Sequence, residues 1–227
     1  MSATAADLGL LRLLQLASPT LPIGAYAYSQ GLEWAVEAGW VSDQASLSLW
    51  LVEQLEQTLA NVDLPLLVRL FDAVEHDDAG RLATWSTYLL ACRETRELRA
   101  DDCDRGRALA RLLRDLDVAA AGPWARRDDV PLATVWAIAA HAWAVSLRTA
   151  LISYAWGWLE NQVLAGVKLI PLGQVAGQRL LLALAPRIPE LCEAALACDD
   201  DHIGATLPAL AIASSLHETQ YTRLFRS

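Results

Sequence analysis

Few residues of this chain have the type and spacing that catalysis requires. The segment Tyr28-Ser29-Gln30-Gly31 resembles half of a GxSxG nucleophile elbow, in which a serine hydroxyl attacks from a sharp strand-to-helix turn. Ala27 stands where that motif has its first glycine, and no strand is predicted before it. We therefore interpret Ser29 as the N-cap of a helix rather than as a nucleophile.

The histidines and cysteines are spaced too widely to predict a metal site. No two histidines form HxH or HExxH, and no two cysteines form CxxC. We expect surface or core histidines, and buried free thiols in a reducing compartment. Neither a Walker-type phosphate loop nor GxGxxG is present, so no nucleotide site or bound cofactor is predicted. The residues concerned are His76, His141, His202, His217, Cys92, Cys103, Cys192 and Cys198.

Composition limits the class of protein. The 227 residues are 54% hydrophobic, with a mean hydropathy of +0.26. This is enough apolar material for a sizeable core, with some left for an interface. The net charge of −9 argues against a nucleic-acid-binding protein, which needs a basic surface. Residues 1–7 show no secretory signal, so we expect a cytoplasmic protein.

Apolar residues recur every three or four positions along most of the chain, which predicts helices. We expect helix starts at Ser42-Asp43, at Asp63, and at the acidic cluster 101–104, because oxygen-bearing and acidic side chains favour helix N-termini. Another helix is predicted from Ser146 to about Lys168. No segment alternates with the period of a strand.

The uncharged run at residues 130–147 is long enough to raise the question of a membrane span. It is rich in alanine, contains His141 and meets Arg148 directly, without aromatic residues at both ends. We interpret it as a central helix buried on all sides. The sequence thus predicts an all-α, single-domain bundle of about ten helices, some short.

The segment at residues 16–33, here called the proline loop, is the one long stretch that reads as neither helix nor polar linker. Pro19 and Pro22 exclude a helix through it, and Gly24 and Gly31 allow unusual backbone angles. Such a loop either packs on the body of the protein or is kept for a partner. Its apolar and aromatic residues are Leu21, Ile23, Tyr26 and Tyr28.

The last residues, 214–227, mix aromatic, apolar and basic side chains to the end of the sequence. Ser215 and Glu218 fit a helix capping box. Loose tails are normally polar, whereas aromatic residues and arginine dominate the centres of protein interfaces. Either this tail folds back on its own bundle, or Tyr221, Leu224 and Phe225 anchor a partner.

Three runs resemble the UreF family of urease accessory proteins: LLQLASPTLPIGAYAYSQGLEWAVEAGWV near the start, VKLIPLGQVAGQR at 167–179, and HETQYTRLFRS at 217–227. Their order and separation match that family across essentially the whole chain. Gly24-Ala25 stands where other members often have two glycines, which we interpret as tolerated variation.

The resemblance implies a non-enzymatic, all-helical maturation factor, or chaperone, for nickel-dependent urease. Such proteins tend to dimerise and bind the accessory protein UreD, called UreH in some organisms. The pair recruits the GTPase UreG, docks on apo-urease (UreABC), and regulates the GTPase while nickel is inserted. Catalytic, metal and cofactor sites would then belong to partners, and neither nucleic acid nor a membrane is expected as a partner.

Site residues follow from the resemblance by position. The segment that orders against UreD corresponds here to residues of the C-terminal tail, within a single UreF-like domain at 1–227. The GTPase-recruiting surface corresponds to Tyr26, Lys168 and Arg223, where Lys168, the only lysine, and Arg223 would supply positive charge. We expect a flexible N-terminus at 1–7 and a partner-binding tail at 215–227. The tail residues in contact with UreD would be Gln220, Tyr221, Arg223, Leu224 and Phe225.

Two other classes of protein stay open. An enzyme would need convergent catalytic groups and would turn over a substrate without partners. A helical membrane-associated protein would need detergent for extraction. We expect instead a soluble but aggregation-prone chain, because apolar surface that awaits partners is adhesive when the chain is expressed alone.

Overall fold

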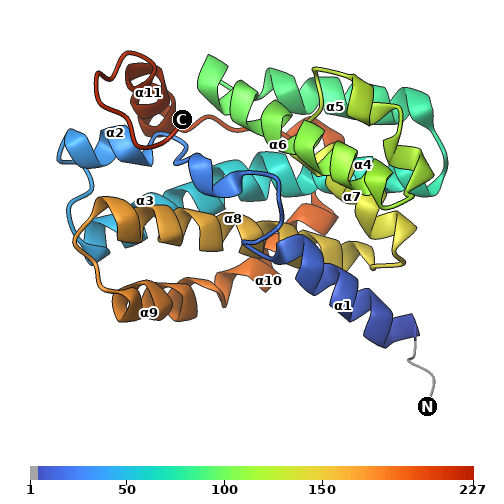
Figure 1. Ribbon diagram of the computed structural model, residues 1–227, viewed down its shortest axis with the longest axis horizontal. Coiled ribbons are helices and arrows are strands. Elements are labelled where there is room, and N and C mark those ends of the chain that lie inside the picture. The colour runs from blue at the N-terminus through green and yellow to red at the C-terminus, as the bar shows by residue number, and fades with distance from the viewer. Residues whose placement is uncertain (1–4) are drawn as a thin grey trace.

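The computed structural model describes residues 5–227, with side chains described from Leu8, and within that range it contains eleven α-helices and no strand. The predicted all-α bundle of about ten helices is confirmed (Figure 1). A π-helical segment, η2 (Leu55–Asp63), joins α3 to α4, and short 3-10 turns include η1 (Ala25–Ala27). The helices are α1 (Ala5–Ala17), α2 (Leu32–Glu37), α3 (Gln44–Gln54), α4 (Leu64–Glu75), α5 (Ala79–Ala91), α6 (Arg96–Asp115), α7 (Leu132–Ala142), α8 (Leu147–Leu169), α9 (Gln174–Leu184), α10 (Arg187–Ala197) and α11 (Pro208–His217).

Helix α7 lies at the centre of the molecule. Every residue from 132 to 140 is buried, which confirms the interpretation of the uncharged run as a core helix. Helix α7 packs against α4, α6 and α8. It ends at Ala142, before the uncharged run does, because Ala144 adopts a left-handed backbone conformation with φ of 54°. Within the described chain, no helix is both long and apolar enough to cross a membrane.

The contact between α6 and the segment that leads into α7 requires a glycine. A Cβ atom on Gly106 would lie 2.0 Å from the carbonyl oxygen of Val130, far inside van der Waals contact. The backbone of α6 therefore approaches the start of α7 more closely than any side chain would allow.

Some helix starts agree with the sequence. Asp43 caps α3, its side chain accepts from the N–H of Ser46 at 2.8 Å, and Ser46 completes a capping box. Ser146 caps α8 and accepts from the N–H of Thr149 at 3.3 Å. Local hydrogen bonding decides both positions, so the sequence around them was sufficient.

Other predicted starts are wrong. Helix α6 begins at Arg96 after the cap Thr95, which places the acidic cluster in mid-helix rather than at its start. Asp63 does not cap a helix, because it lies in helical conformation inside the continuous run from η2 to α4 and makes no cap hydrogen bond. The carboxylates misread as helix starts instead form buried or partly buried ion pairs with Arg93 and Arg105, described below.

Two caps near the ends of the chain also differ. Helix α2 starts after Gly31, whose φ of 79° suits glycine, although the Ser29 Oγ still accepts from the N–H of Glu33 at 3.3 Å. The proposed capping box at Ser215 is wrong, because that residue lies inside α11, whose start is at Pro208.

The C-terminal end lies beside α2 although the two are at opposite ends of the sequence (Figure 1). The last helix, α11, packs against α2, and the residues after it return along the proline loop. The expectation of a flexible N-terminus at 1–7 rests mainly on residues 1–4, which lie outside the described residues. Helix α1 begins at Ala5.

Candidate partner interface

Three segments that are far apart in the sequence meet at Lys168, near the end of α8. The Lys168 Nζ lies 5.9 Å from the ring centroid of Tyr26 in the proline loop. It lies 5.6 Å from the ring centroid of Phe225 in the tail. Both distances fall within the range of cation–π attraction. The structure therefore brings Tyr26, Lys168 and Phe225 together in one cluster.

The end of the tail is bound to the proline loop. The Ser227 carbonyl oxygen accepts from the backbone N–H of Ser29 at 2.7 Å and from its Oγ at 2.5 Å. The Arg226 N–H donates to the Ala27 carbonyl at 2.8 Å. Phe225 is only 5% exposed, so it is a buried anchor rather than a free contact. Loop and tail thus pack on each other, while the ring of Tyr26 stays 66% exposed. The Ser29 hydroxyl is fully buried and donates to the tail within this contact. The buried surface on which the tail packs is here called the seat.

Two buried carboxylates hold the tail from below. Glu33 of α2 accepts from the backbone N–H groups of Leu224 at 2.6 Å and Phe225 at 2.9 Å. Glu97 of α6 accepts from Arg223 at 2.8 Å. Hydrogen bonds to a charged acceptor are stronger than neutral ones, so these contacts fix the path of the tail.

His217 joins the two carboxylates. Its Nδ1 lies 2.7 Å from Glu97 Oε2, and its Nε2 lies 3.0 Å from Glu33 Oε2. Each ring nitrogen has a carboxylate oxygen within hydrogen-bonding distance, so the ring bridges the two glutamates. His217 is fully buried. Of the two positions expected for a histidine, core or surface, His217 therefore takes the core.

The outer side of the tail remains open. Tyr221 is fully exposed, Leu224 is 67% exposed, and the side chain of Arg223 is 39% exposed. Gln220 donates to Glu37 of α2 at 2.6 Å. Of the seven residues predicted for partner binding, Phe225 is buried in the seat and Gln220 is partly covered, while the other five present surface to solvent.

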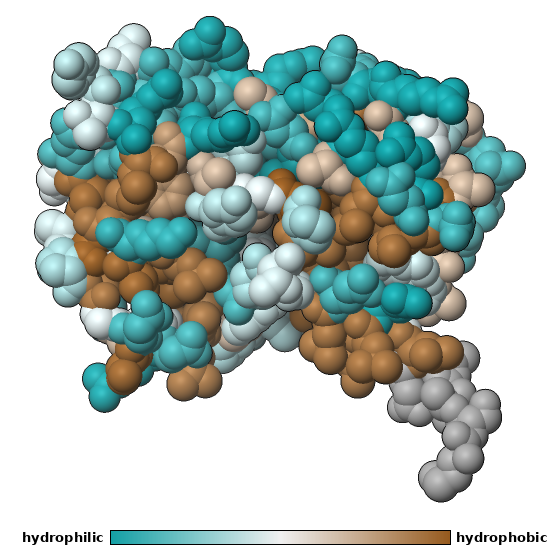
Figure 2. All heavy atoms as spheres, viewed as in Figure 1, coloured by the Kyte–Doolittle hydropathy of each residue, from teal (hydrophilic) through white to brown (hydrophobic). Residues whose placement is uncertain are grey.

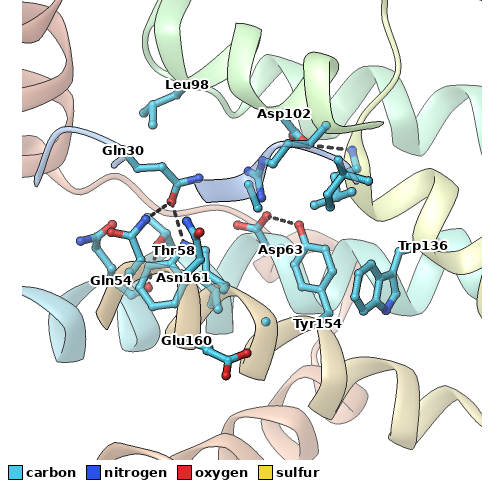
Figure 3. A pocket seen from close by; sticks show the side chains of 18 of the residues that line it. Gln30, Gln54, Thr58, Asp63, Leu98, Asp102, Trp136, Tyr154, Glu160 and Asn161 are labelled. Atoms are coloured by element: carbon cyan, nitrogen blue, oxygen red, sulfur yellow. Dashed lines mark hydrogen bonds between the residues drawn. The ribbon is translucent and has the colours of Figure 1, made fainter. Parts of the chain in front are cut away.

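Beneath the proline loop lies a cavity of about 120 Å³, partly lined by the loop (Figure 3). Gln30 reaches across it: its Nε2 donates to Asp101 at 2.7 Å, and its Oε1 accepts from Trp158 Nε1 at 2.8 Å. Gln162 donates to the same oxygen at 3.3 Å. The backbone of Gln30 has a φ of 52°, which is unusual for a residue other than glycine. The hydrogen bonds of its side chain hold it in this conformation.

An ion cluster closes the inner wall of the cavity. Arg93 donates to Asp63 at 2.5 Å and to Asp102 at 2.8 Å, and the Tyr154 hydroxyl donates to Asp63 at 3.3 Å. Burial alone would lower the pKa of Arg93, but the two carboxylates outweigh it and hold that pKa well above its ordinary value. Burial, followed by the nearby carboxylates, raises the pKa of Tyr154 well above its ordinary value. Both groups therefore keep their protons, and the cluster acts as a structural tie.

A neighbouring pair ties the proline loop to α6. Asp101, fully buried, accepts from Arg105 at 2.5 and 2.8 Å and from Gln30. Burial raises the pKa of Asp101, although Arg105 opposes this shift. These contacts join the loop to the helix bundle. Asp101 is engaged by Arg105 and Gln30, so it is not arranged as a base for the Ser29 hydroxyl, which donates to Ser227. In the part of the chain that the structure describes, no group of three or more His, Cys, Asp or Glu residues is arranged to hold a metal ion.

Sequence reasoning missed the residues that position the tail. Glu33 and Glu97 stand in no site motif of the sequence, and His217 reads as an isolated histidine. Their roles depend on the meeting of α2, α6 and α11, which no local pattern reports. The sequence offered one signal: Glu33 lies in the first of the three runs that carry the family resemblance, and His217 lies in the last. Glu97 lies in none of them.

A second exposed feature is the apolar face of α1. Figure 2 shows hydrophobic atoms gathered along this helix, next to the grey residues. A contiguous patch of exposed apolar side chains is more often an interaction site than a surface without function. The residues and their exposed fractions are Leu8 52%, Leu10 55%, Leu11 60% and Leu14 58%.

Comparison with known proteins agrees with the resemblance of the three runs. The UreF family model matches residues 41–185. A urease accessory protein UreF of Alkalilimnicola ehrlichii is 55% identical over 219 residues, which cover 95% of each chain. Those of Pseudomonas putida and Marinomonas sp. are 54% and 47% identical, covering 97% of this chain and 99% and 95% of their own. The chain therefore belongs to the UreF family of urease accessory proteins.

Proposed function

We propose that this chain is a non-catalytic scaffold for urease maturation. It binds UreD (UreH), recruits the GTPase UreG and regulates it while nickel is inserted into apo-urease (UreABC). One observation carries the proposal: Tyr26 of the first run and Phe225 of the last lie beside Lys168 of the second, and Glu33 binds the tail backbone next to them. Nickel is cargo in this account, and the ligands that hold it belong to the partners.

The tail supplies the contact with UreD. Glu33 binds the tail backbone, Glu97 binds the Arg223 side chain, and His217 bridges these two carboxylates, so Tyr221 and Leu224 are presented in a set position. Fixing them before binding removes part of the ordering cost of association. Exposed aromatic and apolar side chains on such a support are suited to the centre of an interface.

The cationic pair supplies the contact with the GTPase. Lys168 is exposed at the end of α8, where Tyr26 and Phe225 hold its Nζ. Arg223 is half-exposed and bound to Glu97. Lys168 makes no ion pair among residues 8–227, so it offers a positive charge on a chain with a net charge of −9, which favours rate and specificity of association. Arg223 can offer a partner only the guanidinium donors that Glu97 does not use. The apolar face of α1 is a separate candidate for contact with another maturation factor or a second copy of the chain.

The test is recovery of partners together with urease activation in cells. Lys168→Ala removes an exposed charge without opening the core, and we expect about a tenfold loss of UreG recovery and a parallel loss of active urease. Arg179→Ala is the matched control, because this arginine of α9 is also exposed and lies outside the cluster. Unchanged recovery of both partners by Lys168→Ala and Arg223→Ala would remove these residues from the interface. Catalytic turnover by the isolated chain would overturn the scaffold role itself.

A further inference from the structure

A groove of about 510 Å³ runs beside the cluster described above, between the proline loop and α6. It carries positive charge on an otherwise acidic protein, whose net charge is −9. Three arginines face it and only one carboxylate does. The residues used in the argument are Tyr26, Tyr28, Asp104, Arg107, Arg111 and Arg226.

The single carboxylate of the groove is already occupied. Asp104 accepts from the Tyr28 hydroxyl at 2.9 Å and also forms an ion pair with Arg107. Arg107 is further paired with Asp128 at 2.9 Å. Asp104 and Arg107 thus satisfy each other, and their charges are not available to a ligand.

The other two arginines have no carboxylate partner among residues 8–227. Arg111 is exposed on α6 and makes no ion pair there. The Arg226 guanidinium lies near the Tyr28 hydroxyl and Asp104, which raise its pKa, and its backbone N–H donates to the Ala27 carbonyl. Two guanidinium groups therefore face one groove with donors to spare, and the backbone of Arg226 is held in place.

A planar guanidinium matches the two oxygens of a carboxylate in a bidentate pair. Nucleic acid is a poorer fit, because its binding needs many phosphate contacts and a basic footprint, which a chain of this net charge lacks. The exposed ring of Tyr26 stands at the edge of the groove and joins it to Lys168. The groove is thus continuous with the surface proposed for partner proteins.

We infer that this groove binds an acidic segment of a partner protein, in which at least two Asp or Glu side chains pair with Arg111 and Arg226. The inference deepens the proposed function, on which it rests, by naming the chemistry that the surface recognises. It also assigns a role to Arg111 and Arg226 that is separate from those of Lys168 and the tail residues at 220–225.

The test is direct binding of a fluorescein-labelled hexaglutamate peptide to the full chain, measured by fluorescence anisotropy at low salt. We expect the double variant Arg111→Glu, Arg226→Glu to weaken binding about tenfold or more, because reversed charges repel the peptide. Arg179→Glu, a reversal of one exposed arginine outside the groove, should leave binding unchanged. Binding should also weaken as salt rises, since these charges are exposed.

A neutral double variant, Arg111→Gln, Arg226→Gln, should show an intermediate loss and excludes misfolding as the cause when its thermal unfolding matches the wild type. Equal binding by the wild type and both double variants would overturn the inference. So would tighter, groove-dependent binding of a single-stranded DNA oligonucleotide, or a dimer mass in light scattering that falls to the monomer mass in both double variants, which would place a second copy of the chain in the groove. If hexaglutamate fails to bind while Lys168→Ala still loses UreG, the groove inference falls and the proposed function stands.

Discussion

At the scale of single residues, the tail depends on one buried ionic arrangement. His217 lies between Glu33 and Glu97, and the same two carboxylates bind the backbone of Leu224 and the side chain of Arg223. Burying one carboxylate without a partner costs far more than burying a paired one. The imidazole therefore allows both glutamates to be placed under the tail.

His217→Ala should consequently destabilise the protein by about 3 kcal/mol, because it leaves two buried carboxylates next to each other without the ring between them. Chemical denaturation followed by tryptophan fluorescence measures this. The matched control is His202→Ala, since the His202 side chain is 79% exposed and its removal should change stability by less than about 0.5 kcal/mol. Similar stabilities of the two variants would contradict the role given to His217.

Whether a residue's role could be predicted from the sequence depends on how far away in the sequence its contacts lie. Tyr26, Lys168 and Arg223 were identified from the resemblance of short runs, and the structure places the first two in contact. Glu33 and Glu97 could not be identified, because their partners lie 184 and 120 positions away in the sequence. For Phe225 the sequence left two readings open, and the structure shows it packed on its own bundle, while its contact with a partner stays a prediction.

At the scale of helices, the sequence predicts what local hydrogen bonds decide. The caps Asp43 and Ser146 agree because their partners lie three residues away. The start of α6 was missed although its cap is also local, with Thr95 accepting from the N–H of Leu98 at 3.1 Å. Asp101 and Asp102 look like N-terminal residues but pair with Arg105 and Arg93 in mid-helix. The π-helical η2 has no sequence signal that we recognised.

The crossing of α6 and the start of α7 gives an element-scale prediction. Gly106→Ala should destabilise the protein by about 2–3 kcal/mol, because its Cβ would meet the Val130 carbonyl oxygen at 2.0 Å and the backbone has to move. Gly157→Ala in α8 is the control: nothing lies within 4 Å of its Cβ position. That substitution should be neutral or stabilise by up to about 1 kcal/mol. Thermal unfolding of the two variants compares them, and a stable Gly106→Ala would show that this crossing is looser than described.

At the scale of the molecule, the chain combines a buried all-helical core with exposed surface of two kinds. One kind is apolar or aromatic and comprises the exposed face of α1 with the tail residues Tyr221 and Leu224. The other is cationic on an acidic protein and comprises Lys168, Arg111 and Arg226. Buried charged groups pair with one another, as in the cluster of Arg93 with Asp63 and Asp102. The distribution places the potential for recognition on the outside, as a scaffold requires.

The central claim is that the seated tail is the contact for UreD, and size-exclusion chromatography with light scattering tests it. Tyr221→Ser, Leu224→Ser removes two exposed side chains, and the matched control Val175→Ser, Leu182→Ser removes two exposed apolar side chains of α9. We predict that the wild type and the control co-elute with UreD, and that the tail variant loses at least tenfold in affinity while it stays folded. Formation of the complex by the tail variant with wild-type affinity would contradict the account.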